Sequence, residues 1–134
     1  MPAVRRNSRN SRGKAKGKAR AGTPREAAQD TDAVLLAVHR SRIGDVLKQT
    51  GDLAGKVVLT CSLPMNEDNT ELVVAHFSSG AEEFAKRIPK ARVVAAFQTV
   101  PSEVLFGVYE VRRKARRPSL LYCGDDASGK QVAE

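Results

Sequence analysis

Four short apolar runs set the strongest constraint on how this chain folds. They occupy residues 33–38, 56–61, 91–97 and 118–123. Each run is continuously apolar rather than alternating, which is the pattern of strands buried on both faces. The connections between the runs are too long for hairpins and long enough for helical crossovers. The pattern therefore predicts an α/β fold in which a parallel sheet is built from strand–helix–strand units.

The segments between the runs carry helix-start and helix-stop signals. Ser41 can cap a helix that Gly51 stops. Further along, Ser78 or Ser79 can cap residues 81–88, whose apolar positions fall on one stripe. We expect both helices to be amphipathic crossovers that cover the sheet.

Two more helices are predicted outside these crossovers. Thr23 followed by Pro24 is a cap with a first-turn proline, and it predicts a short helix before the first strand. Asp125 and Asp126 are neighbours whose side chains point in different directions, so we interpret them as the start of a final helix rather than as a catalytic pair.

Charge divides the chain into two parts. Residues 1–25 hold nine of the 23 Lys and Arg side chains and no acid, so the remainder, with 14 bases and 15 acids, is nearly neutral. Residues 1–18 also have almost no large apolar side chains, and we expect them to be a disordered basic tail preceding a domain over residues 19–134. A second basic run at residues 112–117 is expected to be a solvated loop. Either run could contact the phosphates of a nucleic acid.

The sequence contains no motif for membrane insertion, secretion, redox chemistry or metal binding, so the expectations on these points follow from the lack of such motifs. No apolar stretch approaches the length that spans a bilayer, and no signal-peptide core follows the basic N-terminus, which predicts a cytoplasmic protein without membrane contacts. Cys61 and Cys123 each end an apolar run and form no Cys-x-x-Cys pattern, so we expect buried thiols. The polar loop at residues 66–69 lacks the glycine and terminal glutamate of a calcium loop, and no metal site is expected.

Several ordered segments carry a family resemblance. They lie at residues 21–27, 53–58, 95–100 and 122–126. With these segments the chain resembles the NADPH-dependent coenzyme F420 (deazaflavin) oxidoreductases over about residues 10–132. The resemblance implies a Rossmann domain that binds NADP(H), with hydride passing directly between the nicotinamide and a deazaflavin coenzyme F420 near the carboxyl ends of the strands. It implies no catalytic side chain, because the protein supplies position rather than a nucleophile.

The resemblance also implies binding residues. Those expected for NADP(H) are Ser11 and Arg12, at the adenosine 2′-phosphate, and Ala37, Val38, His39, Ser62, Leu63 and Pro64, around the nicotinamide half. Those expected for the acceptor are Gln98, Thr99 and Val100. The chain departs from the family pattern by having His39 for proline, Ser62-Leu63 for Thr-Asn and Gln98 for Asn. His39 is interpreted as a loop residue rather than a general acid or base, since no carboxylate or nucleophile is paired with it.

The family's opening strand and its Gly-x-Gly-x-x-Gly loop do not occur in the sequence. We therefore expect a partial Rossmann-like parallel sheet with crossover helices, truncated at both ends and impaired in cofactor binding, with residues 33–38 at an open sheet edge. Two alternatives stay open. The chain is either a non-catalytic remnant or interaction module, whose open edge pairs with a second copy or another partner chain, or a non-specific nucleic-acid binder acting through its tail.

Overall fold

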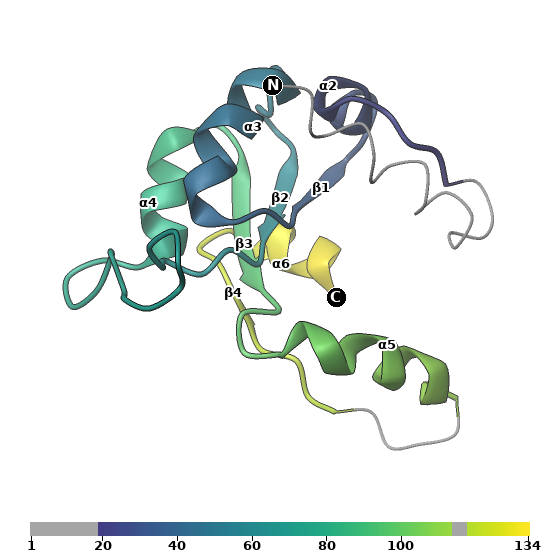
Figure 1. Ribbon diagram of the computed structural model, residues 1–134. Helices are drawn as coiled ribbons and strands as arrows, with labels where there is room; N and C mark the ends of the chain where they lie inside the picture. The colour runs from purple at the N-terminus through teal and green to yellow at the C-terminus, as the bar shows by residue number, and fades with distance from the viewer. Residues whose placement is uncertain (1–18, 114–117) are drawn as a thin grey trace.

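The fold is a four-stranded sheet with helices on both faces (Figure 1). The computed structural model describes residues 19–113 and 118–134, so the predicted disordered tail and most of the second basic run lie outside the described residues. The strands are β1 (Ala33–Leu36), β2 (Val57–Thr60), β3 (Arg92–Ala96) and β4 (Tyr122–Cys123), in the order β1-β2-β3-β4. The helices are α2 (Pro24–Ala28), η1 (Arg40–Arg42), α3 (Ile43–Thr50), α4 (Gly80–Arg87), α5 (Ser102–Val111) and α6 (Ala127–Ala133).

Parallel pairing is confirmed for the first three strands. β1 pairs with β2 in a register that aligns Ala33 with Val57, and β2 pairs with β3 with Val57 opposite Arg92. α3 connects the first pair and α4 the second, which are the crossovers that parallel neighbours require. Within the described residues β1 pairs only with β2, so the predicted open edge is present, and Leu35 on that strand is 57% exposed.

The prediction that the fourth strand is also parallel is wrong. β4 is only two residues long and runs antiparallel to β3, with Ala96 opposite Tyr122 and Ala95 opposite Cys123. The reason is the path of α5, which stays at the end of the sheet where β3 finishes instead of crossing back over a face (Figure 1). The chain therefore enters β4 beside the end of β3 and runs in the opposite direction.

The core explains why the strands are continuously apolar. Val58 packs with Leu36, Ile43 and Phe84 beneath α2, α3 and α4. The opposite face of β2 and β3 contacts α6, where Val94 lies against Gly129. Val57, Val58 and Val94 are fully buried as a result. Burial on both faces is the condition that the sequence pattern predicted.

Helix caps are formed mostly by the predicted residues. Thr23 and Ser79 each complete a capping box, in which the cap side chain and the glutamate three residues later satisfy each other's backbone N–H groups. Asp126 caps α6, and Gly51 ends α3 with a φ of 79°. The predicted Ser41 cap is wrong, because Ser41 lies inside η1 and the residue that caps η1 is His39.

Two further observations bear on the expectations about cysteines and membranes. Cys61 is only half-buried and Cys123 is exposed, so the prediction of two buried thiols is not confirmed for Cys61 and is wrong for Cys123. Cys123 lies on β4, which within the part of the chain that the structure describes has a strand neighbour, β3, on one side only. Among the described residues, no helix has the length and apolarity needed to cross a membrane.

Candidate cofactor-binding rim at the carboxyl ends of the strands

The segments that follow β1, β2 and β3 meet at one edge of the sheet, because parallel strands end on the same side. We call residues 37–39, 62–64 and 98–100 the rim. The rim contains every implied binding residue except Ser11 and Arg12, which lie outside the described residues. Carboxyl edges of this kind are where open α/β sheets bind their ligands.

Hydrogen bonds join the three rim segments in series. The Ser62 hydroxyl donates to the backbone oxygen of Val38 over 2.5 Å, linking the ends of β2 and β1. The Gln98 side-chain amide donates to the backbone oxygen of Ser62 over 3.0 Å, linking the ends of β3 and β2. The rim side chains at 62 and 98, both departures from the family pattern, therefore fix the backbone of the rim.

His39 is held by two polar side chains. Its Nδ1 accepts from the Ser41 backbone N–H over 3.3 Å and lies 2.9 Å from the Ser41 hydroxyl. Its Nε2 lies 3.1 Å from Asn69 Oδ1. Since Asn69 Oδ1 only accepts, the proton belongs on Nε2, and both ring nitrogens already have partners. This geometry agrees with a loop-stabilising role, and it makes Asn69, which the sequence presented only as part of a polar loop, a partner of His39.

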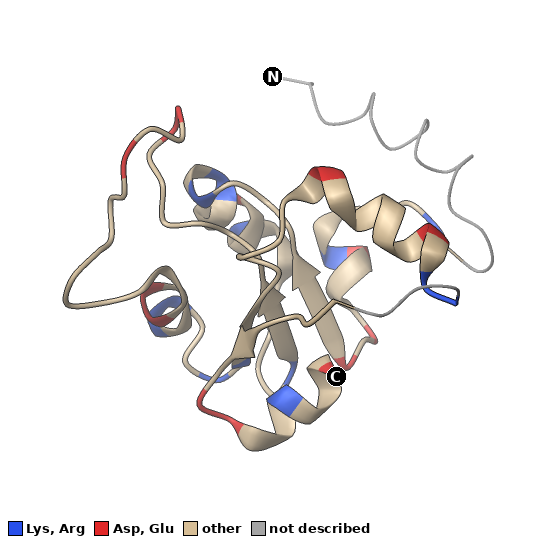
Figure 2. Ribbon diagram, turned by 90° about the horizontal axis from the view of Figure 1, so that it is seen from below, with Lys and Arg blue, Asp and Glu red and all other residues tan. Residues whose placement is uncertain are grey.

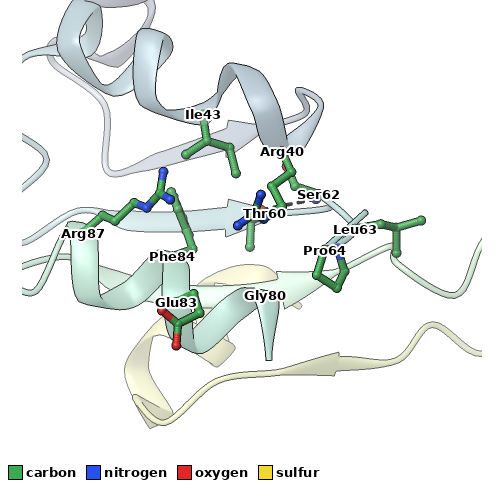
Figure 3. Close-up of a pocket in the computed structure, with 10 residues that line it drawn as sticks. All are labelled: Arg40, Ile43, Thr60, Ser62, Leu63, Pro64, Gly80, Glu83, Phe84 and Arg87. Atoms are coloured by element: carbon green, nitrogen blue, oxygen red, sulfur yellow. Dashed lines mark hydrogen bonds between the residues drawn. The ribbon is translucent and has the colours of Figure 1, made fainter. Parts of the chain in front are cut away.

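A narrow crevice lies beneath the rim, between η1 and α4 (Figure 3). Its walls include Thr60, Pro64 and Phe84, with the cationic side chains Arg40 and Arg87. The cavity volume is about 20 Å³, which is room for roughly one water molecule. A nicotinamide ring does not fit inside it, so a dinucleotide would have to lie on the open side of the rim.

Glu83 is the acid in the wall of this crevice. The Lys86 ammonium and the Ser78 hydroxyl each donate to Glu83 Oε1 over 2.7 Å. Both bonds hold the pKa of Glu83 below its ordinary value, and the bond from Lys86 makes the larger contribution. Glu83 is thus committed to local ion pairing, and it leaves the two arginines as the cationic groups of the crevice.

The third rim segment begins at a sharp change of backbone direction. Phe97, directly after β3, has a φ of 65°, which is unusual for a bulky residue. The turn carries Gln98 and Val100 into half-buried positions and leaves Thr99 exposed. No local sequence signal predicted this conformation, because it depends on how β3 meets the following segment.

Comparisons with known proteins bear directly on this rim. The family model described as NADP oxidoreductase, coenzyme F420-dependent, matches residues 3–64, which include the first two rim segments. Metalloreductase STEAP3 of Rattus norvegicus is 25% identical over 107 residues, covering 80% of this chain and 20% of that protein. The chain therefore spans about a fifth of the length of this curated relative.

Two solved structures share the fold. A protein from Arthrobacter sp. FB24 named as an F420-dependent NADP-reductase superposes with a TM-score of 0.68 at 22% identity, covering 82% of this chain and 51% of that one. Protein SMa0349 from Sinorhizobium meliloti superposes with a TM-score of 0.64 at 27% identity, covering 82% of this chain and 53% of that one. The chain spans about half of each structure. Over residues 3–64 the chain is similar to the coenzyme F420-dependent NADP oxidoreductase family, and its fold is the Rossmann-like architecture of both solved structures.

Proposed function

We propose that this chain is a domain of an NADP(H)-dependent oxidoreductase, in which hydride passes between NADPH and a deazaflavin-type acceptor at the rim. The observation that carries the proposal is the hydrogen-bonded series from Val38 through Ser62 to Gln98. It fixes three strand ends at the edge where dinucleotides lie in this architecture. NADPH supplies the hydride, so the chain's own task is to position two ring systems.

The rim residues suit positioning rather than chemistry. Ala37 is small and exposed, which leaves space above the end of β1 for a flat ring. Gln98 is tied to Ser62, so the adjoining Thr99 and Val100 are available to contact the acceptor. His39 has both ring nitrogens engaged, and hydride transfer requires no proton from it.

We further propose that the 134-residue chain binds NADPH weakly. Its sequence has no Gly-x-Gly-x-x-Gly, the loop whose backbone N–H groups hold the diphosphate at a helix N-terminus. The rim can contact only the nicotinamide half, and Ser11 and Arg12 offer donors for the 2′-phosphate. We expect a dissociation constant on the order of 1 mM.

A titration of the ¹⁵N-labelled chain with NADPH, followed by NMR, tests both statements. Shifts should concentrate on residues 37–39, 62–64 and 98–100 and saturate only at millimolar NADPH. NADH is the matched control ligand, and Arg12→Ala should remove any preference for NADPH over NADH. Tight stoichiometric binding would contradict the weak-affinity proposal, and shifts confined to other surfaces would contradict the rim.

A second candidate function follows from the open edge of the sheet. β1 has one strand neighbour in the described part of the chain, and Leu35 on it is 57% exposed. An unpaired strand edge is a template for pairing with another chain. We propose as the alternative that the chain is a non-catalytic interaction module that binds a partner strand along β1. Protection of the β1 amides from hydrogen exchange on adding a partner, without NADPH affinity, would favour it.

A further inference from the structure

An apolar groove lies along α5, between that helix and the segments that precede and follow it in the chain. Figure 1 shows α5 set apart from the helices that cover the sheet. The groove has a volume of about 590 Å³. We call it the α5 groove, and its apolar walls include Phe97, Val100, Val104, Leu105, Val108 and Leu120.

The size and the lining of the α5 groove are those of a small-molecule site. Such sites have volumes of roughly 300–1,000 Å³ and are mostly apolar, with a few polar groups that fix the orientation of the ligand. Val104, Val108 and Val111 follow one another at spacings of four and three residues, so they form one stripe of α5, and all three line the groove. Val104 is 47% exposed and Val111 is 46% exposed. A ligand laid along this stripe would therefore remove apolar surface from water.

The α5 groove is continuous with the rim. Val100 is the last residue of the third rim segment and is also a wall of the groove. Phe97, which directly precedes that rim segment, is a second shared neighbour. Since α5 begins at Ser102, the rim lies at the N-terminal end of the groove. A ligand that contacts Val100 at the rim therefore also contacts this end of the groove.

A cationic side chain lines the groove at the opposite end of α5. Arg112 directly follows the helix, and its Nη1 donates to the backbone oxygen of Tyr109 over 2.6 Å. Its guanidinium carbon lies 3.8 Å from the centre of the Tyr109 ring, and this cation–π contact helps to fix the position of the guanidinium. Figure 2 shows basic residues at this end of the helix.

No acid of the chain occupies Arg112 in the part of the chain that the structure describes. No carboxylate is paired with its guanidinium there. The two acids of α5, Glu103 and Glu110, are not among the walls of the groove. A guanidinium has five N–H donors, and its planar fork matches the oxygens of an anion, so Arg112 keeps donors for an anionic group of a ligand.

We propose that the α5 groove binds a flat polycyclic ring that carries an arm ending in a phosphate. The ring lies at the rim end, against Val100 and Val104, and the phosphate lies at Arg112. The ten residues of α5 rise by roughly 15 Å, a length for a ring and an extended arm together. Flavins and deazaflavins have this chemistry. To name the ligand as the hydride acceptor rests on the proposed function, whereas its binding in the groove requires no NADPH.

A fluorescence titration without NADPH tests the proposal. The probe is flavin mononucleotide (FMN), and the matched ligand is riboflavin, which has the same ring and arm without the phosphate. Adding the full chain should raise the fluorescence anisotropy of FMN to saturation. Riboflavin should bind roughly tenfold more weakly, because it lacks the charged hydrogen bonds to Arg112. Arg112→Gln should weaken FMN binding to the level of riboflavin and leave riboflavin binding unchanged.

A pair of substitutions on α5 tests the location of the ring. Val104→Glu should weaken the binding of both ligands by roughly tenfold or more, because it places a carboxylate in the apolar wall. The matched control is Phe106→Glu on the same helix. Phe106 is 69% exposed and is not a wall of the groove, so this variant should bind both ligands as the wild type does. Circular dichroism verifies that each variant remains folded.

Three results would overturn the proposal: no saturable binding of FMN by the wild-type chain, equal affinities for FMN and riboflavin, or equal effects of Val104→Glu and Phe106→Glu. A wild-type chain that binds no FMN and forms a dimer that Val104→Glu abolishes would assign the groove to a protein contact instead. The proposed function fails separately, if NADPH shifts no rim residue of a chain that still binds FMN. NADPH binding at the rim of a chain that binds no FMN would overturn only the groove.

Discussion

Gly124, which directly follows β4, tests how the C-terminal elements are attached to the sheet. A Cβ atom at this position would lie 2.6 Å from the backbone oxygen of Val93 and 3.4 Å from Val94 Cα. Backbone atoms cannot rotate out of the way as a side chain can. Gly124→Ala should therefore push β4 away from β3. Only two residue pairs join β4 to β3, so the pairing resists this displacement weakly.

The expected cost can be worked out from two contributions. Overpacking a close contact costs about 1–3 kcal/mol. Moving β4 also loosens α6, which partly uncovers the fully buried Val94 and adds about 1 kcal/mol. We expect Gly124→Ala to lower the free energy of unfolding by about 2–4 kcal/mol, and the melting midpoint by at least about 8 °C. Urea and thermal unfolding followed by far-UV circular dichroism measure both quantities.

Gly44→Ala is the matched control. Gly44 lies inside α3, and a Cβ atom there would meet nothing within 4 Å. Alanine has the higher helix propensity, so this variant should be more stable than the wild type by about 0.5–1 kcal/mol. If Gly124→Ala unfolds within 0.5 kcal/mol of the wild type, or if the two substitutions have the same effect, the close contact with β3 does not hold the C-terminal elements.

Three further predictions concern the elements around the rim. Phe84→Ala should lower the free energy of unfolding in urea by about 3–5 kcal/mol, because Phe84 is buried in the core beneath the rim, and a loss under about 1 kcal/mol would contradict that role. Ser79→Ala should cost about 1 kcal/mol by removing the cap of α4, whereas Ser79→Asp should retain most of the stability; equal losses would exclude capping as the cause. Hydrogen bonds from Ser79 to Glu82, and from Ser128 and then an α6 backbone amide to Asp126, hold the pKa of each carboxyl below its ordinary value. Groups with a lowered folded-state pKa stabilise the protein above the unfolded values near 4.5 and 3.8, and the stabilisation is lost as pH falls through the folded pKa. The melting temperature should thus decrease as the pH is lowered below about 4, and it should decrease less steeply in Glu82→Gln. The same dependence of melting temperature on pH in that variant and in the wild type would refute the assignment.

Local signals in the sequence were enough to predict most of the regular structure. The apolar runs of β1, β2 and β3 and the cap at Thr23 were identified correctly, and the caps Ser79 and Asp126 are each one of the two neighbouring residues predicted. Each cap depends on atoms within three residues of one another, and continuous burial is visible as an unbroken apolar run. These are the interactions that a sequence pattern displays directly.

The errors have a common origin in contacts between distant segments. β4 was assigned the wrong direction. The path of α5 decides from which end the chain enters the sheet, and no pattern in the sequence of α5 predicts that path. Cys123 is exposed because it lies on a sheet edge, although its apolar neighbours resemble a buried strand. Ser41 lies inside η1, and His39, which accepts from the Ser41 backbone N–H as the cap, is held at its other ring nitrogen by Asn69, 30 residues further along the chain.

The sequence by itself determined which segments are strands, where most helices begin, and which residues end up along the rim. Only the tertiary structure decided how the rim is held: Ser62 reaches Val38 across 24 positions and Gln98 reaches Ser62 across 36. It also decided that α5 stands clear of the body with its apolar side chains exposed. The physical reason is that secondary structure follows from interactions between near neighbours in the chain, whereas a binding edge and an uncovered surface depend on where the sheet brings remote segments together.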